Sequence, residues 1–229
     1  MDVNIRGALG TQLFEYLCGL YTAQSTGQTI NKVVIGTGGK VVAPVKIDWL
    51  SQIIDIPYPV EVLPSTAKQD VWKKPNVFKN LASSNVLENI KLKSPVIENG
   101  FKLLHVRGLD RTIASIDDYI KIVCAIGPDV KLIGDDNVLI DKIIHNSNMG
   151  ENVSKGVLED WHLCIGAKEI YCAFTNFTLS AMLFDKNKKI KMLSKQNSNG
   201  TVVIHDPAYK CVDAMFNHYY TNVNKYHII

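Results

Sequence analysis

The sequence predicts an α/β protein built on parallel sheets. Over residues 101–193, short apolar segments of strand length alternate with segments whose apolar residues recur at helical spacing. Near the N-terminus, a glycine-containing turn joins a short strand-like segment to a helical one. The chain has 229 residues, of which 46% are hydrophobic and 21% charged, and this composition is typical of a globular protein with one or two domains.

The N-terminal part, residues 1–100, is predicted to form a smaller unit with shorter elements. Helical spacing of apolar residues predicts a helix over residues 13–23. Prolines and short segments dominate from Pro44 to Asn99, where we expect one short helix over residues 48–53. The strands expected in this part are residues 2–6, 32–36, 60–63 and 90–92.

The C-terminal part, residues 101–229, is predicted to form a more regular, Rossmann-like unit. The strands expected here are residues 102–106, 129–133, 169–173 and 189–193. The helices expected between and after them are residues 115–126, 137–145, 157–166 and 176–184. Asp117 and Asp118 fall in the first turn of helix 115–126, where the helix dipole favours acidic side chains. This alternation predicts a parallel sheet.

Composition excludes several classes of protein. The formal net charge is +3, and no Lys/Arg block is dense enough to suggest a nucleic-acid surface. We find no apolar run of membrane-spanning length and no signal pattern, and therefore expect a cytoplasmic protein of bacterial or viral type, or an excised domain of a larger chain. The spacing of the cysteines and histidines suits neither a disulfide framework nor a protein-bound metal, so most cysteines are expected to be buried thiols. The five cysteines are Cys18, Cys124, Cys164, Cys172 and Cys211.

Polar residues follow two of the predicted strands. His105 and Arg107 fall on one face of strand 102–106, because side chains alternate along a strand. An arginine at the carboxyl end of a parallel strand suits a diphosphate, although a packed histidine beside a solvated arginine explains the pattern equally well. Asp135 and Asp136 follow strand 129–133 and could orient the arginine, cap the next helix or hold a metal. For Asp136, the helix N-cap is the favoured role.

Two turns carry features that suit phosphate groups. The turn from Gly7 to Gln12 allows a close backbone approach before a helix, although a tight strand–helix turn explains it without a ligand. Thr175, Asn176 and Thr178 stand at the start of a predicted helix. They could bind a phosphate or cap the helix.

The order of these motifs resembles that of the fucosyltransferase superfamily. The opening GALGTQLFEY (residues 7–16) is similar to the GxLGNQxFQY opening of alpha-1,2-fucosyltransferases, with Thr11 in place of the asparagine. The segment HVRGLD (residues 105–110) is similar to the HxRRxD motif of alpha-1,2- and alpha-1,6-fucosyltransferases, with Gly108 in place of the second arginine. Protein O-fucosyltransferases also use a single arginine. LIGDD (residues 132–136) resembles the second motif of the superfamily, and the stretch from Asp160 to Asn176 resembles the third.

This resemblance implies a GT-B-like enzyme with two Rossmann-like lobes. Because 229 residues are few for two full lobes, we expect either a reduced N-terminal, acceptor-side lobe or one domain of a longer chain. It implies inversion at the sugar carbon without a metal or cofactor, a nucleotide-sugar donor, most simply GDP-fucose, and a glycan acceptor. By motif position, Arg107 binds the β-phosphate of the donor, and His105 and Asp160 hold the base. The full set of donor-binding residues implied is Gly7, Gly10, Thr11, Gln12, His105, Arg107, Asp136, Asp160, Thr175, Asn176 and Thr178.

The general base and the exact donor are left open by the sequence. Asp110 is the favoured base because it follows Arg107 in the same loop, with Asp117 and Asp118 in reserve. A UDP-rhamnose donor is an alternative, as is a non-catalytic module that binds a nucleotide sugar. A metal-dependent transferase using Asp135 and Asp136 is a third alternative.

Overall fold

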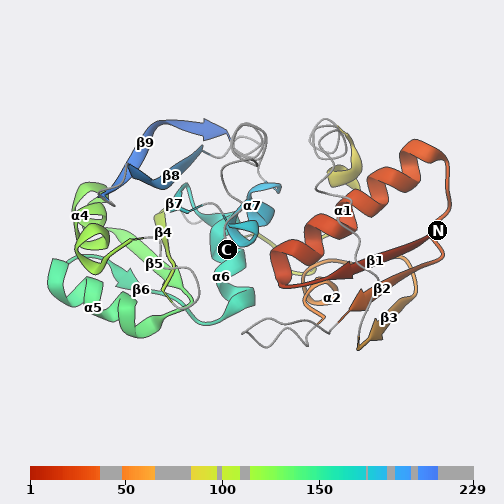
Figure 1. The fold of residues 1–229 in the computed structure, drawn as a ribbon, viewed down its shortest axis with the longest axis horizontal. Helices are drawn as coiled ribbons and strands as arrows, with labels where there is room; N and C mark the ends of the chain where they lie inside the picture. Colours follow the sequence, from red (N-terminus) through yellow and green to blue (C-terminus); the bar gives the residue numbers. More distant parts are fainter. Residues whose placement is uncertain are drawn as a thin grey trace. The chain divides into compact units, whose positions relative to one another are not determined.

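The fold was examined in a computed structural model, which confirms the predicted mixed α/β class. The residues described are 1–36, 48–64, 84–96, 100–108, 114–173, 175–184, 189–196 and 201–210. They fall in two compact units, one within Met1–Pro95 and one within Val96–Met215. Each unit has its own sheet, with three strands in the first and six in the second (Figure 1).

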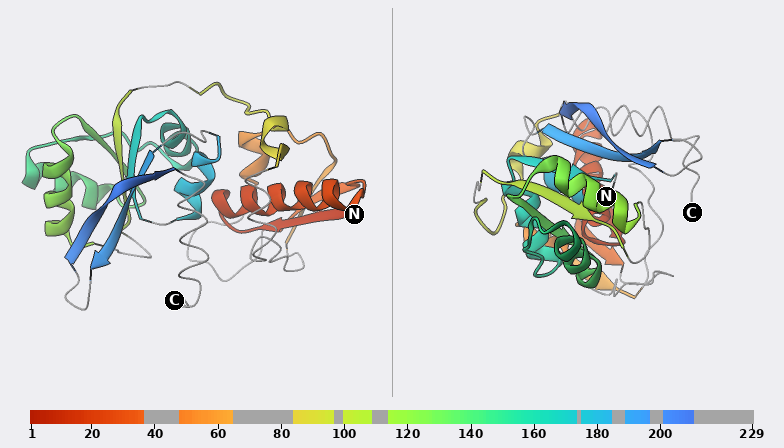
Figure 2. Two further views of the ribbon diagram at one scale, coloured as in Figure 1. Left: turned by 90° about the horizontal axis from the view of Figure 1, so that it is seen from above. Right: turned by 90° about the vertical axis from the view of Figure 1, so that its left-hand side faces the viewer.

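The first unit is a parallel sheet with the strand order β1-β2-β3. Its strands are β1 (Asp2–Arg6), β2 (Lys32–Gly36) and β3 (Val60–Leu63). Helix α1 (Leu9–Thr26) connects β1 to β2 and lies along β1 (Figure 2). The two pack closely at Gly19, where an added Cβ would lie 2.4 Å from a methyl group of Val3. Gly19 therefore allows the helix to approach the sheet.

The remaining elements of the first unit are short. Helix α2 covers only Leu50–Ile53, and a 3-10 helix, η2, covers Val86–Asn89. The strand predicted over residues 90–92 is wrong, because this segment forms only a single bridge between Leu92 and Ile54. The alternating apolar residues of that segment follow η2 and are too few to add a strand to the sheet.

The second unit is a six-stranded sheet with the order β6-β5-β4-β7-β8-β9. All neighbouring strands are parallel except β8 and β9, which form an antiparallel pair (Figure 2). The sequence analysis did not predict β6 or the antiparallel strand β9. The strands are β4 (Lys102–Val106), β5 (Val130–Gly134), β6 (Glu151–Asn152), β7 (Glu169–Cys172), β8 (Lys189–Gln196) and β9 (Thr201–Lys210).

The core of this unit lies between the sheet and two helices. Leu104 and Val106 of β4 pack with side chains of α4 and α5, including Val123 and Ile140, and all four are fully buried. His105, which alternates with them, instead contacts Phe177 of α7. The helices are α4 (Ile116–Ile126), α5 (Asn137–Ser147), α6 (Val157–Gly166) and α7 (Asn176–Met182). The two faces of β4 thus meet different helices.

The strand order creates a switch point between β4 and β7. From β4 the chain adds β5 and then β6 on one side, and afterwards returns to place β7 and β8 on the other side. In open α/β sheets, ligands bind outside the carboxyl ends of the strands at such a point. Residues that directly follow β4 and β7 are therefore the first candidates for a binding site.

Two further expectations concern the cysteines and the membrane. Cys18, Cys164 and Cys172 are buried free thiols, as predicted, whereas Cys124 is exposed and Cys211 lies outside the described residues. Among the described residues, no helix combines the length and the apolar character needed to cross a membrane.

Candidate functional site

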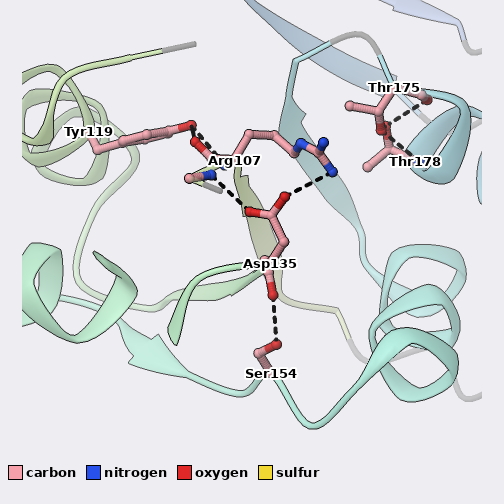
Figure 3. A network of polar contacts seen from close by, with 8 residues as sticks. Arg107, Tyr119, Asp135, Ser154, Thr175 and Thr178 are labelled. Carbon is pink, nitrogen blue, oxygen red and sulfur yellow. Dashed lines mark hydrogen bonds and ion pairs between the residues drawn. The ribbon is translucent and has the colours of Figure 1, made fainter. Parts of the chain in front are cut away.

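Arg107 directly follows β4 at the switch point. Its Nη1 lies 3.1 Å from Asp135 Oδ2, and the two side chains are only 18% and 25% exposed. Figure 3 shows the guanidinium extending from the end of β4 toward the side on which Thr175 and Thr178 of the α7 segment lie. The arginine is thus oriented by a carboxylate at the end of the neighbouring strand. Orienting the arginine was one of the roles that the sequence suggested for Asp135 and Asp136.

The backbone of Arg107 is held by Tyr119 from α4. The Arg107 N–H donates to Tyr119 Oη at 2.9 Å, and that hydroxyl lies 3.3 Å from the Arg107 carbonyl oxygen, to which it donates (Figure 3). Tyr119 is completely buried, and burial raises the pKa of its phenol to about 12. The tyrosine therefore remains protonated at neutral pH and can serve both groups.

The two aspartates after β5 have separate roles. Asp135 Oδ1 accepts the backbone N–H of Gly108 at 2.8 Å, in addition to the ion pair of Asp135 with Arg107. Asp136 is the N-cap of α5, where its Oδ1 accepts the Leu139 N–H at 3.0 Å, and the favoured structural role of Asp136 is confirmed. Within the described ranges, no group of three or more His, Cys, Asp or Glu side chains is arranged to hold a metal ion.

Gly108 is closely surrounded by the N-terminus of α5. An added Cβ would lie 2.7 Å from Asp136 Cβ, 2.9 Å from Asp136 Oδ2 and 3.0 Å from Leu139 Cδ2. The position where the fucosyltransferase motif has a second arginine is therefore packed against the cap of the next helix.

His105 is buried one residue before the end of β4. Its ring centroid lies 5.5 Å from that of Phe177 on α7, and its Nδ1 has no hydrogen-bond partner among the described residues. Burial, together with the nearby positive charge of Arg107, lowers the pKa of His105 to about 3. The imidazole is therefore neutral at physiological pH, and its contact with the donor stays a prediction.

Asp160 sits in the first turn of α6 and binds the loop that precedes this helix. Its carboxylate accepts the Ser154 hydroxyl at 2.6 Å and the Lys155 N–H at 3.0 Å. Burial raises the pKa of Asp160, and these hydrogen bonds oppose that shift. Because Ser154 Oγ also lies 3.3 Å from Gly134 O, this loop is connected to the end of β5 (Figure 3). The predicted contact of Asp160 with the base remains a prediction.

The hydroxyl residues after β7 cap α7. Thr175 Oγ1 accepts the Thr178 N–H at 3.2 Å, and the two hydroxyl oxygens are 2.9 Å apart. Thr178 is fully buried, whereas Thr175 and Asn176 are partly exposed. Capping therefore accounts for both threonines, and the predicted phosphate contacts of the three residues stay predictions.

The remaining predicted donor residues lie in the first unit. Gly7 has φ +91°, a conformation that favours glycine, and it leads into the buried first turn of α1, which contains Gly10. Gln12 is fully buried and its amide is engaged within this unit. It donates to Gly7 O at 2.9 Å and accepts the N–H groups of Trp49 and Leu50, each at 3.1 Å. The contacts of these residues and of Thr11 with a donor are untested.

Of the acidic residues considered as general base, the structure describes Asp117 and Asp118. Asp110 lies outside the described residues. Asp118 belongs to a capping box, in which its backbone N–H donates to Ser115 Oγ at 3.1 Å and its carboxylate accepts the Ser115 N–H. Asp117 occupies the same first turn of α4. Helix capping is thus the role that the structure gives to Asp118.

Sequence reasoning did not place Tyr119 and Ser154 among the site residues, and it named Asp135 only as a residue that could orient the arginine, cap a helix or hold a metal. The position of Asp135 directly after a strand was a usable signal. Tyr119 occupies an apolar position of its helix, and only the packing of α4 on the sheet brings its hydroxyl to the end of β4. No local pattern marks Ser154.

Comparisons with known proteins do not assign this chain to a family. No protein-family model matches the sequence, and no curated protein shows significant similarity to it. One solved structure, provisionally named UDP-N-acetylglucosamine 2-epimerase, from Listeria monocytogenes, is similar with a TM-score of 0.36 and 8% sequence identity. The match covers 85% of this chain and 66% of that chain, just under two thirds of its length.

Proposed function

We propose that this protein is an inverting, metal-independent glycosyltransferase that moves a deoxyhexose, L-fucose from GDP-fucose, to a glycan hydroxyl. The observation that carries the proposal is the placement of Arg107 at the switch point of the second unit, with its guanidinium oriented by Asp135. The order of the fucosyltransferase-like motifs along the sequence supports the choice of donor.

The proposed role of Arg107 is to stabilise the diphosphate leaving group. An acceptor hydroxyl attacks the sugar carbon from the side opposite the diphosphate, a new C–O bond forms, and the bond to the diphosphate oxygen breaks with its electron pair. A general base, for which Asp110 is proposed, accepts the hydroxyl proton. Negative charge grows on the diphosphate, and the guanidinium stabilises it through charge-assisted hydrogen bonds.

Calorimetry with GDP and UDP tests the donor class directly. We expect GDP to bind and Arg107→Ala to weaken its affinity by about 10- to 100-fold, because a charge-assisted hydrogen bond contributes about 1.5–3 kcal/mol. The matched control is Lys142→Ala, which removes an exposed positive charge from α5 in the same unit and leaves Arg107 in place. Binding of neither nucleotide, or unchanged GDP affinity in Arg107→Ala, contradicts the proposal.

Turnover separates the remaining alternatives. With GDP-fucose and UDP-rhamnose offered against a panel of small glycans, transfer from GDP-fucose that is insensitive to EDTA is expected. Transfer from UDP-rhamnose alone would assign a different donor. Tight GDP binding without transfer or hydrolysis would instead indicate a nucleotide-sugar-binding module, and loss of transfer in EDTA would indicate a metal-dependent enzyme.

A further inference from the structure

Arg107 is restrained from two directions by residues of other elements. Tyr119 from α4 engages both the N–H and the carbonyl oxygen of Arg107, which fixes the backbone where β4 ends. Asp135 engages the guanidinium and also accepts the N–H of the next residue, Gly108. Two successive backbone amides and one side chain are thus held at the switch point (Figure 3).

We propose that Asp135 and Tyr119 are positioning residues that hold Arg107 in the conformation in which it binds a diphosphate. This inference rests on the proposed function, because it takes the diphosphate of a nucleotide sugar as the ligand of Arg107. A long arginine side chain loses rotamer freedom when it binds a ligand, and restraint before binding reduces that loss. Such restraint matters for Arg107 because the next residue, Gly108, contributes no second cation to bind the diphosphate.

The two positioning residues make separable contributions. Asp135→Asn keeps a side-chain oxygen that can accept the Gly108 N–H, but it removes the charge that pairs with the guanidinium. Tyr119→Phe keeps the buried ring and removes the hydroxyl that engages the Arg107 backbone. The first variant therefore tests the side-chain restraint, and the second tests the backbone restraint.

Charge alone predicts the opposite result from positioning. Asp135 is negative and lies beside the cation that is to bind an anion, so a purely electrostatic view predicts tighter diphosphate binding in Asp135→Asn. Positioning predicts weaker binding, because the guanidinium is no longer held in place. The sign of the change therefore distinguishes the two.

The experiment compares GDP with GMP by calorimetry in the intact chain. The ratio of the GMP to the GDP dissociation constant reports the contribution of the second phosphate. General damage to the fold weakens the binding of both ligands alike and leaves this ratio unchanged. We expect Arg107→Ala to bring this ratio close to one. Asp135→Asn and Tyr119→Phe are each expected to lower it about three- to tenfold, in line with measured couplings between contacting residues.

The matched control is Ser115→Ala, which removes the cap of the helix that carries Tyr119 and should leave the ratio unchanged. An unchanged or increased ratio in Asp135→Asn overturns the side-chain restraint, and an unchanged ratio in a folded Tyr119→Phe protein overturns the backbone restraint. Thermal unfolding shows whether Tyr119→Phe folds. If it does not, Asp135→Asn alone decides the proposal. If Arg107→Ala itself leaves the ratio unchanged, or the wild-type protein binds neither ligand, the proposed function fails.

Discussion

Replacement of Gly108 by alanine tests how closely this residue, which follows Arg107, packs against the N-terminus of α5. The added Cβ would lie 2.7 Å from Asp136 Cβ and 2.9 Å from Asp136 Oδ2, closer than such atoms approach without a shift. Gly108 is not among the glycines with positive φ, so alanine meets no left-handed strain there and the penalty is steric. Overpacking of this kind destabilises by about 1–3 kcal/mol, and the lower unfolded-state entropy of alanine offsets about 0.4–1 kcal/mol of that. We therefore expect Gly108→Ala to lower the free energy of unfolding by about 1–2 kcal/mol.

A second substitution should remove the penalty. Asp136→Gly deletes the atoms that the new Cβ meets first, and glycine is tolerated at an N-cap with a loss of only a few tenths of a kcal/mol relative to a good capping residue. The third contact, Leu139 Cδ2 at 3.0 Å, is the end of a side chain that can rotate away. In the Asp136→Gly background, Gly108→Ala should thus be neutral or slightly stabilising, which corresponds to a coupling of about 2 kcal/mol between the sites.

Urea unfolding followed by circular dichroism measures all four proteins of this cycle. The control is Gly127→Ala, whose added Cβ would meet nothing within 4 Å. Its φ of +112° makes alanine unfavourable, and this penalty should be the same with and without Asp136. The reasoning fails if Gly108→Ala has the same effect with and without Asp136, or if it is neutral in the wild-type protein. Arginine at this position should be at least as destabilising as alanine.

Further predictions concern pH, a buried amide and a helix cap. Because burial lowers the pKa of His105 from 6.5 to about 3, the unfolded state binds more protons between these values; stability is complete above pH 6.5 and falls as the pH drops toward 3. Urea unfolding should show a loss of about 2 kcal/mol from pH 7 to pH 5 that is absent in His105→Leu, and equal pH dependence of the two proteins would disprove it. Gln12→Met removes the amide that bonds three backbone groups of the first unit and should lower the free energy of unfolding by about 3 kcal/mol, whereas a loss below about 1 kcal/mol would show that water replaces the amide. Ser115→Ala should cost about 1 kcal/mol through loss of the capping box, and an unchanged unfolding midpoint would argue against that cap.

Local sequence patterns predicted most of the secondary structure. Strands Lys102–Val106 and Lys32–Gly36 begin and end where short apolar runs indicated, and helix Val157–Gly166 where the helical spacing of apolar residues indicated. The cap at Asp136 was also predicted, because a cap involves residues only three positions apart. The predicted strand at residues 90–92 failed because so short an apolar run carries little periodicity.

The sequence by itself therefore determined the α/β class, most of the elements, and the presence of Arg107 and Asp135 directly after strands. Only the tertiary structure decided the strand order, which sets the switch point beside Arg107, and the contacts of Tyr119 with Arg107 and of Asp136 with Gly108. The physical reason is range. Periodicity and capping act over a few residues, whereas strand order and these contacts join residues 12 to 28 positions apart or more, and they depend on how the helices pack against the sheet.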